Sequence, residues 1–276
     1  KHGGMMKIGV DTLPPLPRDA TDRNRTSPFA FTGNKFEFRA PGSSQSCAGA
    51  NVIINTIVAE ALDKISGELE KFPKKNFNEK LQGLLQKIIK AHKRIIFNGD
   101  GYTDAWKKEA ARRGLPNAAT TPEALGAFVS EKSKALFEKY NVFTEAELES
   151  RYEIFMEEYA KKVKIEGELS LSMARTIIQP AAGKQVAELA EALVNMSAAG
   201  LTSGVAAKRE TAELLGKLLD NVTKECNDLE YALKTGNQAP VLKAMAALRA
   251  DVDMLELHID DEIWPLPKYR EMLFIS

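Results

Sequence analysis

The chain has 276 residues, of which 44% are hydrophobic and 28% are charged, a composition that is ordinary for a globular protein. Lys plus Arg and Asp plus Glu both number 38, so no net field attracts the chain to nucleic acid, a membrane surface or an acidic partner. We therefore expect neither a nucleic-acid nor a membrane partner, and any charged ligand must be bound by a local cluster.

The two cysteines, Cys47 and Cys226, lie far apart and match no zinc-ligand spacing. This argues against a disulfide framework and favours a reducing, cytoplasmic compartment. The chain begins with Lys1-His2-Gly3-Gly4 rather than with Met, and a strand-like segment follows at once. Such a beginning is expected of a piece cut from a longer polypeptide.

The N-terminal segment is predicted to be extended. Leu13-Pro14-Pro15-Leu16-Pro17 is incompatible with a helix because proline lacks an amide donor. The strand-like runs Phe29–Thr32 and Lys35–Arg39 flank Gly33-Asn34, two residue types that tolerate the positive φ of a tight turn. We predict a β-hairpin here.

Helices are predicted for the rest of the chain. Apolar runs indicate helices over Ala48–Leu62 and Phe77–Ile89, and a short helix through Trp106 is predicted to end near Gly114. The run Thr121-Pro122-Glu123 is typical of a helix start, with Thr as the cap and Pro as the first helical residue.

A long helix is predicted to begin at Thr144, which forms a capping box with Glu147. Its apolar stripe comprises Leu148, Tyr152, Phe155, Tyr159 and Val163. Two further seams comprise Leu214, Leu218, Val222, Leu229 and Leu233, and then Met245, Leu248, Val252, Leu255 and Ile259. The six-residue link Thr235–Pro240 predicts that these two helices form an antiparallel hairpin with a bundle core.

The predicted helices offer little chemistry. Gly183-Lys184 fails as a phosphate-binding loop because the preceding glycine and the following Ser or Thr are missing. His258 has no metal-ligand spacing to another histidine and is predicted to lie on a helix surface. Asp100 and Asp104 lack the other acids of a calcium loop, so a capped turn is expected there.

The second strand of the predicted hairpin carries charges on alternate positions. Lys35, Glu37 and Arg39 project from one face, and the two Phe residues between them from the other. Arg25 adds a guanidinium group nearby. Such a cluster suits a site in which Glu binds a divalent metal and Arg binds phosphate. The pattern alone nevertheless favours a solvated strand face with weak ion pairs.

The run from Asp22 to Arg39 resembles the segment of type III glutamine synthetases that corresponds to the Asn-Arg-Ser and Glu-Val-Arg stretches of the smaller synthetases. The similarity continues through Ile96–Tyr102, Thr144–Tyr152 and Trp264–Arg270, so it covers essentially the whole chain. The resemblance implies an enzyme that joins ammonia to glutamate through γ-glutamyl phosphate, using ATP and Mg²⁺ or Mn²⁺.

The resemblance also implies roles for particular residues. The metal-binding glutamate of the family falls on Glu37, and the arginine that holds the γ-phosphate and the substrate carboxylate falls on Arg39. Arg25 corresponds to an arginine that contacts the nucleotide phosphates. Lys35 replaces an arginine of the smaller enzymes, which keeps the charge but loses the bidentate fork. Ala30 stands where the smaller enzymes have another arginine.

The implied fold is α+β and predominantly helical. Residues 1–95 would form the C-terminal segment of a catalytic domain that includes the hairpin, and residues 96–276 a helical C-terminal domain. The family's other metal ligands lie upstream, so we expect this chain alone to be inactive. The resemblance also implies that the full-length parent protein assembles as a dodecamer of two stacked hexameric rings. The alternative is a helical assembly or regulatory module without catalytic duty, because most of the chain is predicted to be helix without chemistry.

Overall fold

The computed structural model describes residues 45–97 and 100–273, together with the backbone of four short strands that precede them. These strands form two antiparallel pairs, β1 (Met5–Met6) with β2 (Leu16–Pro17) and β3 (Phe29–Phe31) with β4 (Phe36–Phe38). The turn predicted at Gly33-Asn34 lies outside the described residues, so the hairpin of a catalytic domain stays a prediction. From residue 45 on, the described chain is helix and connecting loop, which confirms a predominantly helical protein.

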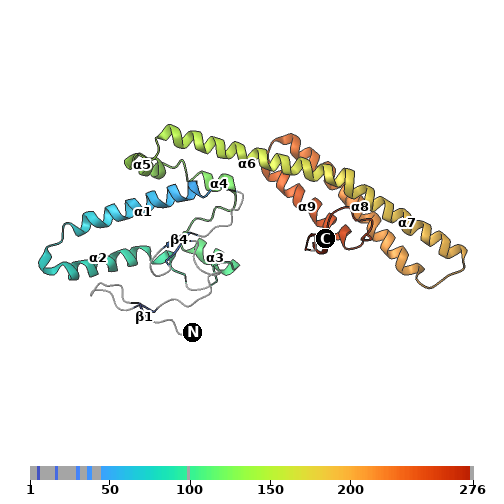
Figure 1. Ribbon diagram of the computed structural model, residues 1–276, viewed down its shortest axis with the longest axis horizontal. Coiled ribbons are helices and arrows are strands. Elements are labelled where there is room, and N and C mark those ends of the chain that lie inside the picture. Colours follow the sequence, from blue (N-terminus) through green and yellow to red (C-terminus); the bar gives the residue numbers. More distant parts are fainter. Residues whose placement is uncertain are drawn as a thin grey trace. The chain divides into compact units, whose positions relative to one another are not determined.

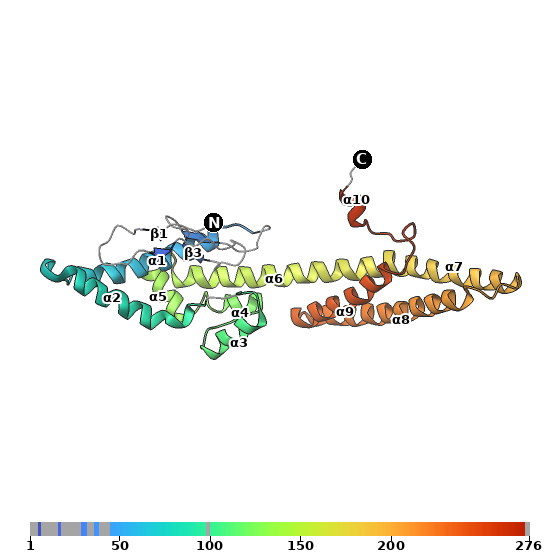
Figure 2. The same cartoon turned by 90° about the horizontal axis from the view of Figure 1, so that it is seen from below.

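Two compact units make up the chain, Lys1–Tyr152 and Glu153–Ser276. The long helix α6 (Glu145–Met173) runs through the division between them (Figures 1 and 2). The domain boundary predicted after residue 95 therefore stays a prediction, and each unit is described separately below.

In the first unit, α1 and α2 diverge from a tight connection that contains the 3-10 turn η2 (Figure 1). Three shorter helices follow a second 3-10 turn, η3. The bounds are α1 (Ala48–Leu69), η2 (Lys74–Asn76), α2 (Phe77–His92), η3 (Lys93–Ile95), α3 (Asp104–Arg112), α4 (Thr121–Leu125) and α5 (Glu131–Lys139). All helices predicted for this part of the chain are present.

The helix starts in this unit confirm the predicted capping, with one correction. The cap of α4 is Thr120, not Thr121, and its side chain accepts a hydrogen bond from the Glu123 amide in a capping box. Thr120 has an extended backbone, with φ −124° and ψ 155°, which lets its hydroxyl reach back to the first turn. Pro122 therefore occupies the second helical position, where its missing N–H still costs nothing.

The second unit is a helical bundle. Its helices after α6 are α7 (Gln179–Ala198), α8 (Val205–Thr235), α9 (Gln238–Glu256) and α10 (Tyr269–Leu273). A single π turn, η4 (Ala174–Ile178), joins α6 to α7 without interrupting the helical run. Pro180 explains this turn, because it has no N–H to donate to the carbonyl four residues earlier and its ring clashes with that carbonyl.

The core of the second unit consists of buried apolar side chains from α8 and α9, together with others from α6, η4, α7 and the segment after α9. The predicted seam of α9 is confirmed, and Leu255 is fully buried. The seam of α8 needs one correction, because Leu214 is 36% exposed whereas Leu215 is fully buried. The buried side chains of α8 repeat at intervals of three and four residues, which places Leu215 in phase and Leu214 beside the seam. They are Leu215, Leu218, Val222, Cys226, Leu229 and Ala232.

The predicted hairpin of α8 and α9 is confirmed, although its link is shorter than expected. Gly236 ends α8 in the left-handed conformation with φ +70°, which only glycine adopts without strain. Asn237 then caps α9, because its side chain accepts a hydrogen bond from the Ala239 amide. Pro240 falls inside the first turn of α9, so only two residues separate the helices.

The predicted stripe of α6 is only partly buried. Leu148 is fully buried and Val163 is 4% exposed, but Phe155 is 41% exposed. Leu148 belongs to the first unit and Val163 to the core of the second. One periodic stripe therefore contributes buried side chains to both units.

Candidate functional site

The residues predicted to form an active site lie in the N-terminal segment. Arg25, Lys35 and Arg39 fall outside the described residues, and Glu37 lies in β4, where only the backbone is described. In the pairing of β3 with β4, position 37 is directly opposite Ala30. Ala30, one of the two positions at which the resemblance implies a departure from the smaller synthetases, is thus the cross-strand partner of the predicted metal ligand. The four roles themselves stay predictions.

Among the described residues, no group of three or more His, Cys, Asp or Glu side chains is placed to bind a metal ion. Asp100 accepts a hydrogen bond from the Tyr102 amide at 3.0 Å, so it forms a capped turn as expected. Gly183 lies inside α7, which agrees with rejecting a phosphate-binding loop. His258 is exposed but follows the end of α9 rather than lying within it.

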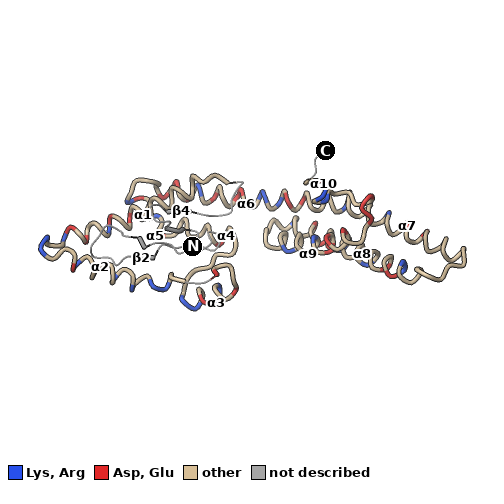
Figure 3. The backbone as a smooth tube through the Cα atoms, turned by 60° about the horizontal axis from the view of Figure 1, so that its bottom comes forward, with Lys and Arg blue, Asp and Glu red and all other residues tan. Residues whose placement is uncertain are grey.

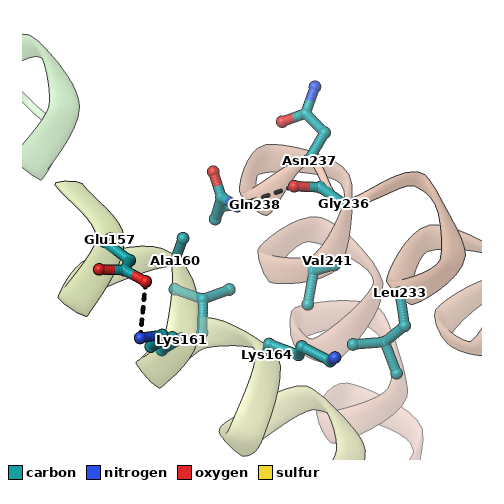
Figure 4. A pocket seen from close by; sticks show the side chains of 10 residues that line it. Glu157, Ala160, Lys161, Lys164, Leu233, Gly236, Asn237, Gln238 and Val241 are labelled. Atoms are coloured by element: carbon teal, nitrogen blue, oxygen red, sulfur yellow. Dashed lines mark hydrogen bonds and ion pairs between the residues drawn. The ribbon is translucent and has the colours of Figure 1, made fainter. Parts of the chain in front are cut away.

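A cleft of about 180 Å³ lies between α6 and the link from α8 to α9 (Figure 4). Val163, Leu233 and Val241 form its apolar part, and Lys161 at its edge is paired with Glu157 at 2.6 Å. No His, Cys, Ser or Thr lines this cleft. Because Val163 and Val241 of the bundle core form its wall, we interpret it as a packing groove between helices.

A compact polar cluster fixes the segment around Ile96, which is part of the similarity noted above. Arg113 donates hydrogen bonds to the carbonyl oxygens of Ile96 at 2.8 Å and Arg94 at 3.1 Å. Its guanidinium group also lies over the Trp106 ring, which stacks on Phe97 with centroids 4.2 Å apart. No local pattern predicts this role of Arg113, because the carbonyl groups that it binds lie 17 and 19 residues away.

Glu109 completes this cluster. Hydrogen bonds from Arg112 and Arg113 lower the pKa of its carboxyl to about 2. The carboxylate accepts from both guanidinium groups at 2.6 Å, so it stays ionised at any physiological pH. The cluster positions a loop rather than performing chemistry, because each of these charged groups is already paired.

Other ion pairs join the helices of the first unit. Lys134 of α5 contacts Glu145 and Glu149 of α6, and these two carboxylates raise the pKa of its ammonium group. Lys139 of α5 lies 2.7 Å from Asp63 of α1. Lys and Arg are interspersed with Asp and Glu along many of the described helices (Figure 3), but from Lys74 to Arg94 the charged residues are basic apart from Glu79.

The two cysteines differ in environment. Cys226 is 1% exposed in the core of the second unit, and burial raises the pKa of its thiol. A buried thiol with a raised pKa is a poor nucleophile. Cys47 is exposed. Both are free thiols.

No described helix is both long and apolar enough to cross a bilayer.

Comparisons with known proteins identify relatives of the whole chain. Residues 80–197 match the family model "Glutamine synthetase C-terminal domain". The chain is 41% identical to a type-3 glutamine synthetase of Dictyostelium discoideum over 98% of its length. It is 38% identical to a glutamine synthetase of Bacteroides fragilis over 98% and 34% identical to one of Butyrivibrio fibrisolvens over 93%.

The chain spans 39%, 39% and 38% of the lengths of these three relatives, respectively. The family match and the identity along nearly the whole chain agree with the resemblance carried by the Asp22–Arg39 run. The chain therefore belongs to the type III glutamine synthetase family and corresponds to a C-terminal portion of such a synthetase.

Proposed function

We propose that this chain is part of an ATP-dependent ligase that joins glutamate and ammonia into glutamine through γ-glutamyl phosphate. The observation that carries the proposal is the 41% identity to a type-3 glutamine synthetase over 98% of the chain. The similarity thus extends beyond the helical region matched by the family model at residues 80–197 and takes in the N-terminal strands.

The proposed roles follow from the chemistry of the side chains in the Asp22–Arg39 run. Glu37 supplies a carboxylate, the hard oxygen ligand that Mg²⁺ and Mn²⁺ prefer. Arg39 and Arg25 supply guanidinium groups that suit phosphate and carboxylate oxygens. Lys35 binds nucleotide phosphate as a point charge. The bound metal would neutralise the negative charge of the phosphate oxygens.

The proposed site is incomplete within this chain. A single proposed carboxylate ligand cannot hold the two divalent ions of the family's site, so further ligands must come from the rest of the parent protein. We also propose that the parent is cytoplasmic and assembles as a homo-oligomer, a dodecamer of two hexameric rings.

We propose a second role for the helical region. This role is assembly or regulation, without a part in catalysis. Large apolar side chains that are more than half exposed favour this role. They include Ile57 and Leu62 on α1 and Ile165 and Leu169 on α6. The two roles are compatible, because they concern different parts of the chain.

The test compares residues 1–276 with a full-length protein of this family that contains them, by γ-glutamyl transfer with ATP and Mg²⁺. We expect activity only in the full-length protein, and Glu37→Ala there to lower turnover by about 10²-fold or more, since a metal ligand is lost. Glu79→Ala, an exposed acid on α2, is the matched control. Strong activity of the chain alone, or an unchanged rate for Glu37→Ala, would contradict the proposal.

A further inference from the structure

The charges of this chain are divided unequally between its two units. The first unit contains 24 Lys and Arg against 18 Asp and Glu, and the second contains 14 against 20. The two excesses cancel, which gives the chain its net charge of zero. Two copies of such a chain do not repel each other as whole molecules, whereas the first unit of one attracts the second unit of the other.

Much of the positive excess lies on α2 and on the 3-10 turns that flank it. The range Lys74–Arg94 contains seven Lys and Arg but only one acid. The nearest ion pairs along the sequence are Lys71 with Glu68 and Lys107 with Asp104. No cation within this range therefore has an acidic partner among the described residues.

Three of these cations form one exposed face of α2. Lys80, Lys87 and Lys90 are seven and three residues apart, spacings that align side chains in a helix, and we call them the basic surface. Gly83 lies on the same face, and a Cβ added there would meet nothing within 4 Å. The described residues thus leave this face open, whereas Leu85 on the opposite side of α2 is half-buried.

An acidic surface lies at the end of α9 and in the turn that follows it. It consists of Glu256, which is half-buried, and of Asp260 and Glu262, which are exposed. No Lys or Arg occurs between Arg249 and Lys268, and those two cations pair with other carboxylates. The three carboxylates of the acidic surface have no ion-pair partner in the part of the chain that the structure describes.

The turn that carries the acidic surface is anchored in the bundle. The side chain of Gln185, which is buried in α7, accepts a hydrogen bond from the Asp260 amide at 2.8 Å. Ile259 is 5% exposed and Trp264 is 6% exposed, so both hold the turn against the core. Carboxylates on an anchored turn lose little backbone freedom when they bind a partner, which favours association.

Both surfaces border an exposed apolar side chain. Ile95, just after α2, is 61% exposed, and Leu257, just after α9, is 73% exposed. An exposed ion pair contributes only about 0.2–1 kcal/mol, so a few such pairs alone make a weak contact. Removal of these apolar side chains from water would stabilise the same contact further.

Phosphate-rich partners fit the molecule less well than a second copy does. The acidic excess of the second unit repels a polyanion that approaches α2. An anionic membrane surface would need the apolar side of α2 for insertion, but Leu85 on that side is half-buried. Neither objection applies to the acidic surface of another copy.

We propose that the basic surface of one copy docks on the acidic surface of a second copy. The contact is head-to-tail, because different patches of the two copies meet, so its repetition builds a closed ring or an open filament. The inference deepens the homo-oligomer of the proposed function by naming the surfaces through which its copies meet.

The first test uses the wild-type chain, so no variant has to fold. Copies labelled with ¹⁴N and with ¹⁵N are mixed and treated with a carbodiimide, which joins lysine amines to carboxylates in direct contact. We expect Lys87 or Lys90 to be joined to the acidic surface in peptides with one light and one heavy half. Cross-links within single copies only, or from α2 to other carboxylates of the second copy, would overturn the proposal.

The second test exchanges the charges and measures self-association by sedimentation velocity at about 50 mM and 500 mM salt. We expect Lys87→Glu with Lys90→Glu to raise the dissociation constant about 10-fold or more at low salt, because attraction becomes repulsion. Glu256→Lys with Glu262→Lys should do the same. All four substitutions together should restore the association, since the signs are then exchanged on both sides.

The matched control is Lys208→Glu with Arg209→Glu, which reverses two exposed cations of α8 and changes the net charge equally. It should leave the association unchanged. A chain that is monomeric at low salt, an association that salt does not weaken, or a fourfold variant without restored association would contradict the docking. So would a monomeric chain that binds RNA or anionic vesicles through α2. None of these results bears on the ligase function, because that is tested separately by γ-glutamyl transfer in the full-length protein.

Discussion

At the scale of single residues, Gly167 shows how closely α6 approaches the α8–α9 hairpin. A Cβ at this position would lie 2.9 Å from Cδ2 of Leu233 and 3.0 Å from Cγ1 of Val241. Glycine in a helix interior is unfavourable by roughly 1 kcal/mol relative to alanine. We infer that the close packing of three helices at this point offsets that cost.

We therefore predict that Gly167→Val lowers the free energy of unfolding by about 1–3 kcal/mol, the usual effect of overpacking a core. Gly183→Val is the matched control, because a Cβ there meets nothing within 4 Å. It should change stability by less than about 0.5 kcal/mol. Urea unfolding followed by circular dichroism measures both variants, and equal stabilities would contradict the packing account.

At the scale of elements, the start of α6 depends on one hydroxyl. Thr144 accepts a hydrogen bond from the Glu147 amide at 3.3 Å, and Glu147 accepts one from the Thr144 amide at 2.8 Å. Thr144→Ala should cost about 1 kcal/mol and speed hydrogen exchange in the first turn of α6. Thr202→Ala, at an exposed position in the loop before α8, is the control. Unchanged exchange at the Glu147 amide in Thr144→Ala would contradict the prediction.

The elements that local chemistry determines could be predicted from the sequence. Capping boxes, apolar runs and the glycine after α3 predict helix ends because each acts within a few residues. The predicted seam of α8 is correct at Leu218, Val222 and Leu229 but includes Leu214 in place of Leu215, because both are leucine and only packing selects between them. The π turn before Pro180 was missed because proline also fits an ordinary helix start.

The candidate site was predicted differently from the elements around it. The Asp22–Arg39 run was found because its residues are contiguous, so a motif is visible without a fold. The cluster around Arg113 is not predicted, because the carbonyl groups that it binds lie 17 and 19 residues away in the sequence. Such contacts depend on tertiary packing, which periodicity does not specify.

At the scale of the whole molecule, the composition predicts a globular protein but not its division into two units. The division after Tyr152 falls inside α6, where the sequence continues a regular helical pattern without any linker. The family match at residues 80–197 also runs across this point. A domain boundary that falls inside a helix cannot be recognised from composition, because the residues on both sides of it have the same helix-forming character.

The buried cores of the two units should unfold separately. Phe137 in the first unit is 2% exposed and packs against Phe143, with ring centroids 5.4 Å apart, whereas Leu229 in the second unit is fully buried. Phe137→Ala should destabilise the first unit by about 3–5 kcal/mol and Leu229→Ala the second by about 2–5 kcal/mol. In thermal unfolding each variant should lower one transition and leave the other in place, so each serves as the control for the other. A single transition that both substitutions lower would mean that α6 couples the two cores into one cooperative unit.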